Sequence, residues 1–181
     1  HLIISIMAGV SLGQLEEMLD TSRLVRTMPN TPTQIGQGFT VWTPGSGASA
    51  DDKKNATNIL SAFGGTLELQ NEDLVNAATA ISGSGPAYVF LLAEALEESA
   101  VALGFDRAVA RQLVSETLRG SSALYYDQRA VDPVEQRRRV TSPGGTTNAA
   151  MEQLGVEKFI TLWKAATRVA YERAKELSGG K

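Results

Sequence analysis

A change of hydrophobic pattern near residue 70 restricts the fold to two parts of different class. Residues 1–69 alternate short apolar runs with helical segments, which is the pattern of an α/β sheet with too few strands to be complete. From Asn71 onward, apolar residues recur at helical spacing, and glycine or proline marks the segment ends. The sequence therefore predicts an α/β part, residues 1–69, followed by an all-helical part, residues 70–181.

The first part is predicted to contain short strands and two helices. Residues 2–6 form a continuous apolar run, which is typical of a parallel strand that is covered on both faces. Further elements are expected as strands at residues 23–28, 39–42 and 67–69, and as helices at residues 11–16 and 51–63. Gly64 and Gly65 are expected to end the second helix. Because His1 directly precedes the first apolar run, we expect the chain to be a fragment without its upstream strands.

The second part is predicted to contain five helices. They are expected at residues 86–103, from Asp106 as a cap through Leu124, and at residues 133–139, 146–154 and 156–177. These helices carry more apolar surface than about 110 residues readily cover. A homodimer that shares helices would cover that surface. A self-contained bundle explains the pattern equally well.

Composition limits the chemistry that the chain can perform. Cysteine is absent and His1 is the only histidine, which excludes disulfides, thiolate nucleophiles, a Ser-His-Asp triad and Cys- or His-ligated zinc. The net charge of −3 gives no support for a nucleic-acid or membrane partner, and no apolar run reaches the ~20 residues that cross a bilayer. The lack of cysteine fits a reducing compartment, so a cytoplasmic location is expected. Reactive groups must be hydroxyls, carboxylates, lysines, backbone amides or a cofactor.

Two loops that contain proline are candidate parts of a site. Residues 28–32, MPNTP, follow a predicted strand, and ligands bind beyond the carboxyl ends of strands in open α/β sheets. A turn that merely ends the strand explains this loop equally well. Residues 81–86, ISGSGP, open a predicted helix, and the two glycines permit close approach of a ligand or a helix. Close packing, with Ser84 as a helix cap, is the better explanation of this second loop.

A third loop leads into another predicted helix. Residues 140–147, VTSPGGTT, place free backbone N–H groups at a helix N-terminus, where a carboxylate or phosphate would be favoured. No Gly-Lys-Ser/Thr follows, so this is not a Walker loop. A capped helix entry remains an equal alternative. The arginines at residues 137–139 are interpreted as a solvated helix end, with added positive potential over an anion site as the alternative.

Taken together and in this order, these motifs resemble those of the pyrroline-5-carboxylate reductases. The stretches that carry the resemblance are residues 4–10, 26–32, 81–88 and 140–147, and the resemblance covers nearly the whole chain. It implies the C-terminal portion of a Rossmann-type NAD(P)-binding domain at residues 1–69 and an all-helical dimerisation and substrate-binding domain at residues 70–181. It also implies reduction of 1-pyrroline-5-carboxylate to L-proline, the last step of proline biosynthesis, with hydride from NADPH or NADH. The helical domains would form a homodimer, which in this family often assembles further into a decamer.

The resemblance also implies roles for individual residues. The nicotinamide end of the cofactor is expected near Ile6, Met7, Ala8 and Gly9, beside Met28, Pro29 and Asn30. The substrate carboxylate is expected on Gly144, Gly145, Thr146 and Thr147, and Glu72 aligns with an acidic residue near the substrate in some relatives. With no interior histidine, the Thr147 hydroxyl or a bound water is the candidate proton donor to the imine nitrogen.

One departure from the family and two alternatives bear on this interpretation. The glycine-rich dinucleotide fingerprint is absent from residues 1–70, so this chain alone is expected to bind the cofactor poorly and to be impaired. A non-catalytic helical module would use residues 144–147 only to begin a helix. A β-hydroxyacid dehydrogenase would need a catalytic lysine in the helical part. The lysines there lie within or after the last helix, at Lys158, Lys164, Lys175 and Lys181, outside the expected Gly/Asn-rich context.

Overall fold

The computed structural model describes residues 1–179, which form two compact units. The first unit comprises His1–Ala87 together with the chain from Lys164 onward, and the second comprises Tyr88–Trp163. This division falls inside two long helices, whereas the domain boundary predicted between residues 69 and 70 follows the change of fold class. That boundary therefore stays a prediction, and each unit is described by itself.

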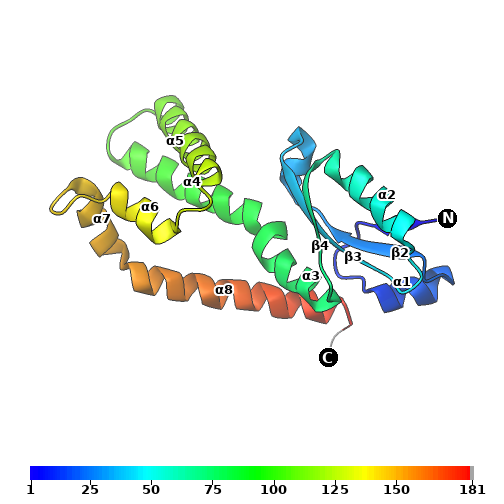
Figure 1. The fold of residues 1–181 in the computed structure, drawn as a ribbon. Coiled ribbons are helices and arrows are strands. Elements are labelled where there is room, and N and C mark those ends of the chain that lie inside the picture. The colour runs from blue at the N-terminus through cyan, green and yellow to red at the C-terminus, as the bar shows by residue number, and fades with distance from the viewer. Residues whose placement is uncertain (180–181) are drawn as a thin grey trace. The chain divides into compact units, whose positions relative to one another are not determined.

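A mixed four-stranded sheet forms the centre of the first unit (Figure 1). Its strands are β1 (Ile3–Ser5), β2 (Leu24–Met28), β3 (Gly38–Pro44) and β4 (Gly64–Glu68), in that spatial order. β1 is parallel to β2, β3 is antiparallel to β2, and β4 is parallel to β3. All four predicted strands are therefore confirmed, with shifted bounds.

Helices pack against both faces of this sheet. Consecutive strand residues point to opposite faces, so Val25 and Arg26 of β2 face different helices. Val25 and Trp42 form a buried core with Ala56 and Leu60 of α2 (Ala50–Ser61). Arg26 faces the opposite way and bonds to side chains of α3 (Glu72–Ala78). The short helix α1 (Leu12–Leu19), expected at residues 11–16, begins with a capping box formed by Ser11 and Gln14.

Two expectations for the first unit were wrong in detail. Gly64 and Gly65 do not end the second helix, because α2 ends at Ser61 and both glycines belong to β4. A Cβ atom at Gly64 would lie 2.1 Å from the Gly38 carbonyl oxygen, so the close approach of β3 requires glycine there. The first strand is also shorter and less covered than predicted, since Ile3 and Ile4 are only half-buried.

The remaining helices match the predicted helical part. They are α4 (Gly85–Ala102), α5 (Arg107–Asp127), α6 (Pro133–Arg139), α7 (Thr146–Leu154) and α8 (Val156–Leu177). Asp106 caps α5 through a bond to the Val109 N–H, as predicted. The sequence did not predict α3 (Glu72–Ala78) as a separate helix. This helix passes into α4 through a π-helical turn at Thr79–Gly83.

The second unit buries little apolar surface within this chain. Among the described residues of Tyr88–Trp163, only Ala110 and Val114 are buried apolar side chains. Large apolar side chains are exposed on these helices, for example Phe90 and Leu162. A self-contained bundle would bury such side chains, so the structure favours a partner over that alternative. No helix within residues 1–179 is both long and apolar enough to span a membrane.

Candidate active site

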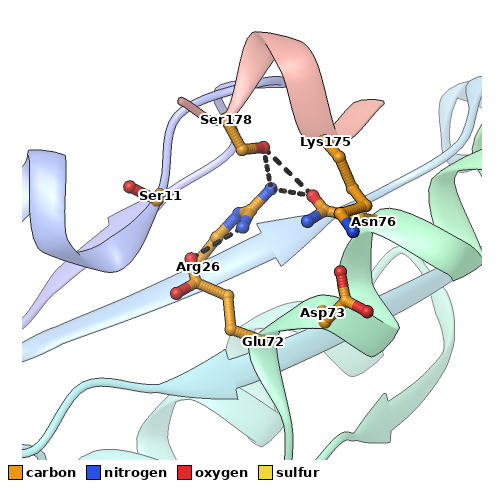
Figure 2. A pocket seen from close by; sticks show the side chains of 7 residues that line it. All are labelled: Ser11, Arg26, Glu72, Asp73, Asn76, Lys175 and Ser178. Carbon is orange, nitrogen blue, oxygen red and sulfur yellow. Dashed lines mark hydrogen bonds and ion pairs between the residues drawn. The ribbon is translucent and has the colours of Figure 1, made fainter. Parts of the chain in front are cut away.

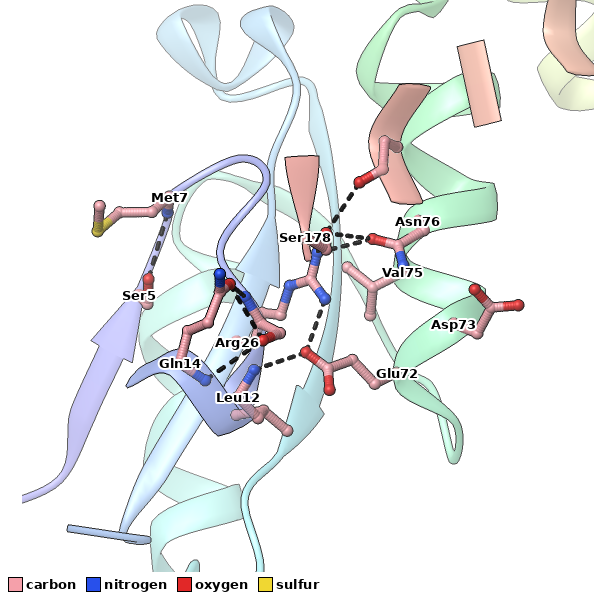
Figure 3. Close-up of polar contacts among 12 residues, drawn as sticks. Ser5, Met7, Leu12, Gln14, Arg26, Glu72, Asp73, Val75, Asn76 and Ser178 are labelled. Atoms are coloured by element: carbon pink, nitrogen blue, oxygen red, sulfur yellow. Dashed lines mark hydrogen bonds and ion pairs between the residues drawn. The ribbon is translucent and has the colours of Figure 1, made fainter. Parts of the chain in front are cut away.

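The predicted cofactor segments follow two neighbouring parallel strands. β1 leads into residues 6–9 and β2 leads into residues 28–30, so both segments lie at the same edge of the sheet. The strand ends are tied together, because the Thr27 hydroxyl donates to the Ser5 carbonyl at 2.8 Å. The Met7 N–H donates to the Ser5 hydroxyl at 3.3 Å, a contact visible in Figure 3. Ile6 and Met7 are exposed, at 68% and 54%.

This arrangement leaves apolar surface at a position where α/β sheets bind ligands. The crevice beyond the carboxyl ends of parallel strands is the usual ligand position in such sheets. The structure thus brings the segments at residues 6–9 and 28–30 together.

The MPNTP loop, residues 28–32, also contacts the ISGSGP motif. Its Asn30 side chain accepts a hydrogen bond from the Phe39 N–H at 2.9 Å and donates one to the Ser82 carbonyl at 3.2 Å. A Cβ atom at Gly83 would lie 2.8 Å from the Met28 methyl carbon, so the turn packs closely on the Met28 side chain, and a larger residue would displace that methyl group. The structure therefore supports the packing explanation for Gly83, whereas a Cβ atom at Gly85 would meet nothing within 4 Å.

The same motif contains the π-helical turn. The Ser84 N–H donates to the Thr79 carbonyl at 2.8 Å, a bond that spans one residue more than in an α-helix. Ser84 has right-handed helical angles, φ −82° and ψ −17°, so the chain is already helical where a cap was expected. The predicted helix cap at Ser84 was therefore wrong. Single π-helical turns inside α-helices are frequent at functional sites.

The GGTT loop, residues 144–147, lies in the second unit and begins α7. Gly144 has a φ of 70°, which favours glycine, and Gly145 is the N-cap residue. No side chain caps the N-terminus of α7 within the part of the chain that the structure describes. The first backbone N–H groups of this helix therefore remain available for an anion. Thr147, in the first turn, is half-buried.

The arginines at residues 137–139 end α6. Arg138 and Arg139 both pair with Glu135, at 2.7 and 3.1 Å, and all three arginines are exposed. These two guanidinium groups, Arg138 first, lower the pKa of Glu135 to about 2. Local pairing of this kind favours the solvated helix end over an anion site.

A small open pocket of about 210 Å³ lies in the first unit (Figure 2). Arg26, with a side chain only 3% exposed, donates to Glu72 at 2.6 Å, to Asn76 at 2.8 Å and to the Ser178 hydroxyl at 3.2 Å. Glu72 also accepts from the Leu12 N–H at 2.7 Å (Figure 3). A buried guanidinium requires such partners because desolvation of an unpaired charge is costly.

This network gives Glu72 a structural role in the first unit. Its carboxylate joins α3 to β2 and to the start of α1, so at least one oxygen is occupied by protein donors. A role of Glu72 toward substrate stays a prediction. The residue missed by sequence reasoning is Arg26, although an arginine inside the buried strand LVRTM was a usable signal.

A second contact holds α8 against α3 in the same unit. The Tyr171 hydroxyl donates to the Asp73 carboxylate at 2.6 Å. This hydrogen bond lowers the pKa of Asp73 and raises the pKa of Tyr171. This bond, together with the contacts of Ser178 with Arg26 and Asn76, holds the C-terminal part of α8 against the rest of the first unit.

Comparison with known proteins decides the family. Residues 72–177 match the family described as pyrroline-5-carboxylate reductase dimerisation. The chain belongs to the pyrroline-5-carboxylate reductase family. This match favours the reductases over the β-hydroxyacid dehydrogenases.

Individual relatives agree with this assignment. The chain is 40% identical to the pyrroline-5-carboxylate reductase of Pseudomonas aeruginosa, over 98% of the chain and 65% of that protein. It is 39% identical to the Synechocystis reductase, over 97% of the chain and again 65% of the relative. The chain thus spans slightly less than two thirds of these relatives' length.

Solved structures of reductases share the fold. The Coxiella burnetii pyrroline-5-carboxylate reductase superposes with a TM-score of 0.90 at 37% identity, covering 98% of this chain and 66% of that one. The Plasmodium falciparum pyrroline carboxylate reductase, solved with NADP bound, gives 0.88 at 34% identity, covering 98% and 71%.

Proposed function

We propose that this chain supplies the substrate loop and the nicotinamide end of the cofactor site in a reductase that converts 1-pyrroline-5-carboxylate to L-proline. The observation that carries the proposal is the uncapped N-terminus of α7 at the GGTT loop. The substrate has one carboxylate, and a helix N-terminus with free N–H groups suits one. Membership of the reductase family supports the same substrate.

The substrate loop would act by orienting the imine. Backbone N–H groups of Thr146 and Thr147 would hold the carboxylate, so that the imine carbon is presented in one direction. The Gly145 N–H donates to the Ser142 carbonyl at 3.0 Å in this structure, so it would join them only if that turn opened. Orientation of this kind lowers a reaction barrier by several kcal/mol, which corresponds to an effective molarity of about 10⁵ M or more. The half-buried Thr147 hydroxyl makes no hydrogen bond to another described residue, so it is free to donate toward the imine nitrogen.

NADPH or NADH would supply the hydride when bound. The residues of this chain fit the nicotinamide end only: exposed Ile6 and Met7 offer apolar surface beside Met28, at the shared edge of β1 and β2. Ala8, Gly9, Pro29 and Asn30 complete the two segments that we propose for this end. The pyrophosphate fingerprint is not in residues 1–70, so no residue described here is assigned to the rest of the cofactor.

The exposed helices support assembly into a homodimer through residues 72–177. This range matches the dimerisation family, and it contains the exposed apolar side chains of α4 and α8. Association into a decamer and a cytoplasmic location stay predictions.

The function is tested with a chimera, called the completed enzyme. It joins this chain to the part of the Pseudomonas aeruginosa reductase that has no counterpart in this chain. The assay measures NADPH and NADH oxidation that depends on 1-pyrroline-5-carboxylate. We expect turnover, and its absence from a folded dimer with either cofactor would contradict the proposal.

Thr147→Ala in the completed enzyme tests the proton donor. We expect kcat/KM to fall by about 10²-fold, a typical contribution of one positioned proton donor. Thr147→Ser keeps a hydroxyl and should retain most of the activity. Thr161→Ala is the matched control, because that hydroxyl only donates to the Glu157 carbonyl of its own helix. Unchanged kcat and KM in Thr147→Ala would remove this hydroxyl from the mechanism.

A further inference from the structure

Asn30 holds together two motifs that are 52 residues apart in the sequence. We infer that Asn30 is a positioning residue of the reductase, which fixes the π-helical turn at Thr79–Gly83 against the loop at residues 28–32. The inference rests on the proposed function, because it concerns the edge of the site where the cofactor's nicotinamide end is proposed to bind. It assigns to Asn30 an action through Ser82 rather than a direct contact with the reacting atoms.

The reason for this contact lies in Pro86. In an α-helix the carbonyl of residue 82 would accept a hydrogen bond from the N–H of residue 86. Proline has no N–H, so Pro86 leaves the Ser82 carbonyl without its helical donor. Two neighbouring donors are used elsewhere: the Ala87 N–H donates to the Ser84 carbonyl at 3.0 Å, and the Ser84 N–H donates to the Thr79 carbonyl at 2.8 Å. The Asn30 amide, at 3.2 Å, supplies the missing donor.

The two bonds of Asn30 also explain why an amide is needed. Its oxygen faces the Phe39 N–H and its nitrogen faces the Ser82 carbonyl, so each end of the side chain meets a group of opposite kind. Aspartate would keep the bond to Phe39 but would place a second oxygen against the Ser82 carbonyl. Alanine would remove both bonds. Only an amide satisfies both partners at once.

The contact reaches the proposed cofactor surface through close packing. Met28 lies directly against Gly83 in the turn that Asn30 holds. A shift of the π-helical turn would therefore move Met28 and the loop that we propose to border the nicotinamide. Small displacements of this kind change reaction rates strongly, because the reacting atoms must align closely.

The test uses four variants of the completed enzyme, assayed well below their melting temperatures. Asn30→Asp and Asn30→Ala should each lower kcat/KM per folded molecule by about tenfold or more. Thr33→Ala is the matched control directly after the loop at residues 28–32, since its hydroxyl only donates to the Asn30 backbone carbonyl at 2.8 Å. The rescue variant combines Asn30→Ala with Pro86→Ala, because an alanine at position 86 restores the N–H that Ser82 lacks. It should recover a substantial part of the lost activity, and Thr33→Ala should stay near wild type.

A second readout does not depend on turnover. The hydrogen-exchange rate of the Ser84 amide, which reports on the π-helical turn, should rise in Asn30→Ala and fall again in the rescue variant. Equal exchange rates in all variants would overturn the inference. Wild-type kcat and KM in both Asn30 variants would also overturn it while leaving the proposed function intact. A wild-type completed enzyme without turnover would instead contradict the proposed function itself.

Discussion

The two units of the chain differ in how far they bury their apolar side chains. In the first unit, Leu24, Val25 and Trp42 are at most 2% exposed. In the described part of the second unit, the buried apolar residues are the small Ala110 and Val114. The first unit therefore buries a hydrophobic core of its own, whereas the second presents its apolar side chains outward.

This difference shows where the chain depends on a partner. Burial of apolar surface is the main favourable term in folding, and contiguous exposed apolar surface usually marks an interface. The match to a dimerisation family covers the exposed helices. We expect substitutions in the first unit to act mainly on its own folding stability, and substitutions on the helices to act mainly on association.

Trp42→Ala should have the largest effect on stability. Trp42 packs against Val25, Ala56 and Leu60, so its removal leaves a large cavity in the core of the first unit. Truncation of a buried aromatic side chain costs about 3–5 kcal/mol of unfolding free energy. Urea denaturation followed by circular dichroism measures this loss. A loss below about 1 kcal/mol would mean that the sheet core contributes less than its burial indicates.

Phe90→Glu should weaken association more than folding of the first unit. Phe90 is 65% exposed on α4, and a charge buried there in a homodimer would lack a partner. We expect the dimer dissociation constant to rise at least ~100-fold, which sedimentation velocity over a range of concentrations measures. Ile59→Glu is the control, since Ile59 is 51% exposed on α2 of the first unit. Equal effects of the two substitutions would abolish the distinction between the units.

Local signals in the sequence were sufficient to predict many helix ends. The predicted bounds of α7 and α8 match the structure because Gly155, with a φ of 60°, separates two strongly periodic segments. The same reasoning was wrong for Gly64, because the sequence does not distinguish a glycine at a helix end from a glycine required by strand packing. Local pattern therefore predicts elements well but does not reveal why a particular glycine is present.

The candidate site was predicted less completely, because its contacts are non-local. The motifs were identified, but the bond from Asn30 to Ser82 and the pairing of Arg26 with Glu72 join distant parts of the chain. No periodicity or spacing encodes which distant residue meets a given side chain. The roles of Thr147 and of the cofactor segments were inferred from resemblance and stay predictions.

The smallest expected effect concerns acid stability, and it again separates the units. In the first unit, buried Asp52 accepts two hydrogen bonds from Arg23, at 2.8 and 2.7 Å, and one from the Ser49 N–H at 3.0 Å. Arg23 first, and then Ser49, hold the pKa of Asp52 well below its usual range. A carboxyl with a lower pKa in the folded state stabilises the fold above its unfolded pKa, near 4. That contribution is lost as the pH falls below about 4 toward the folded pKa.

Asp52→Asn should therefore reduce stability at pH 7 and flatten its decline between about pH 5 and pH 2. Thermal unfolding followed across this range measures the effect. Glu135→Gln in α6 is the comparison, because Glu135 also has a lowered pKa, about 2, but pairs only with Arg138 and Arg139 of its own helix. Its partners are local and exposed, so its loss should change the unfolding of the first unit little. If the pH dependence of thermal unfolding changed equally in both variants, the two ion pairs would not distinguish the stability of the first unit from that of the second. A profile that changes only in Asp52→Asn would locate the acid-sensitive contact where Arg23 ties the start of α2 to the sheet.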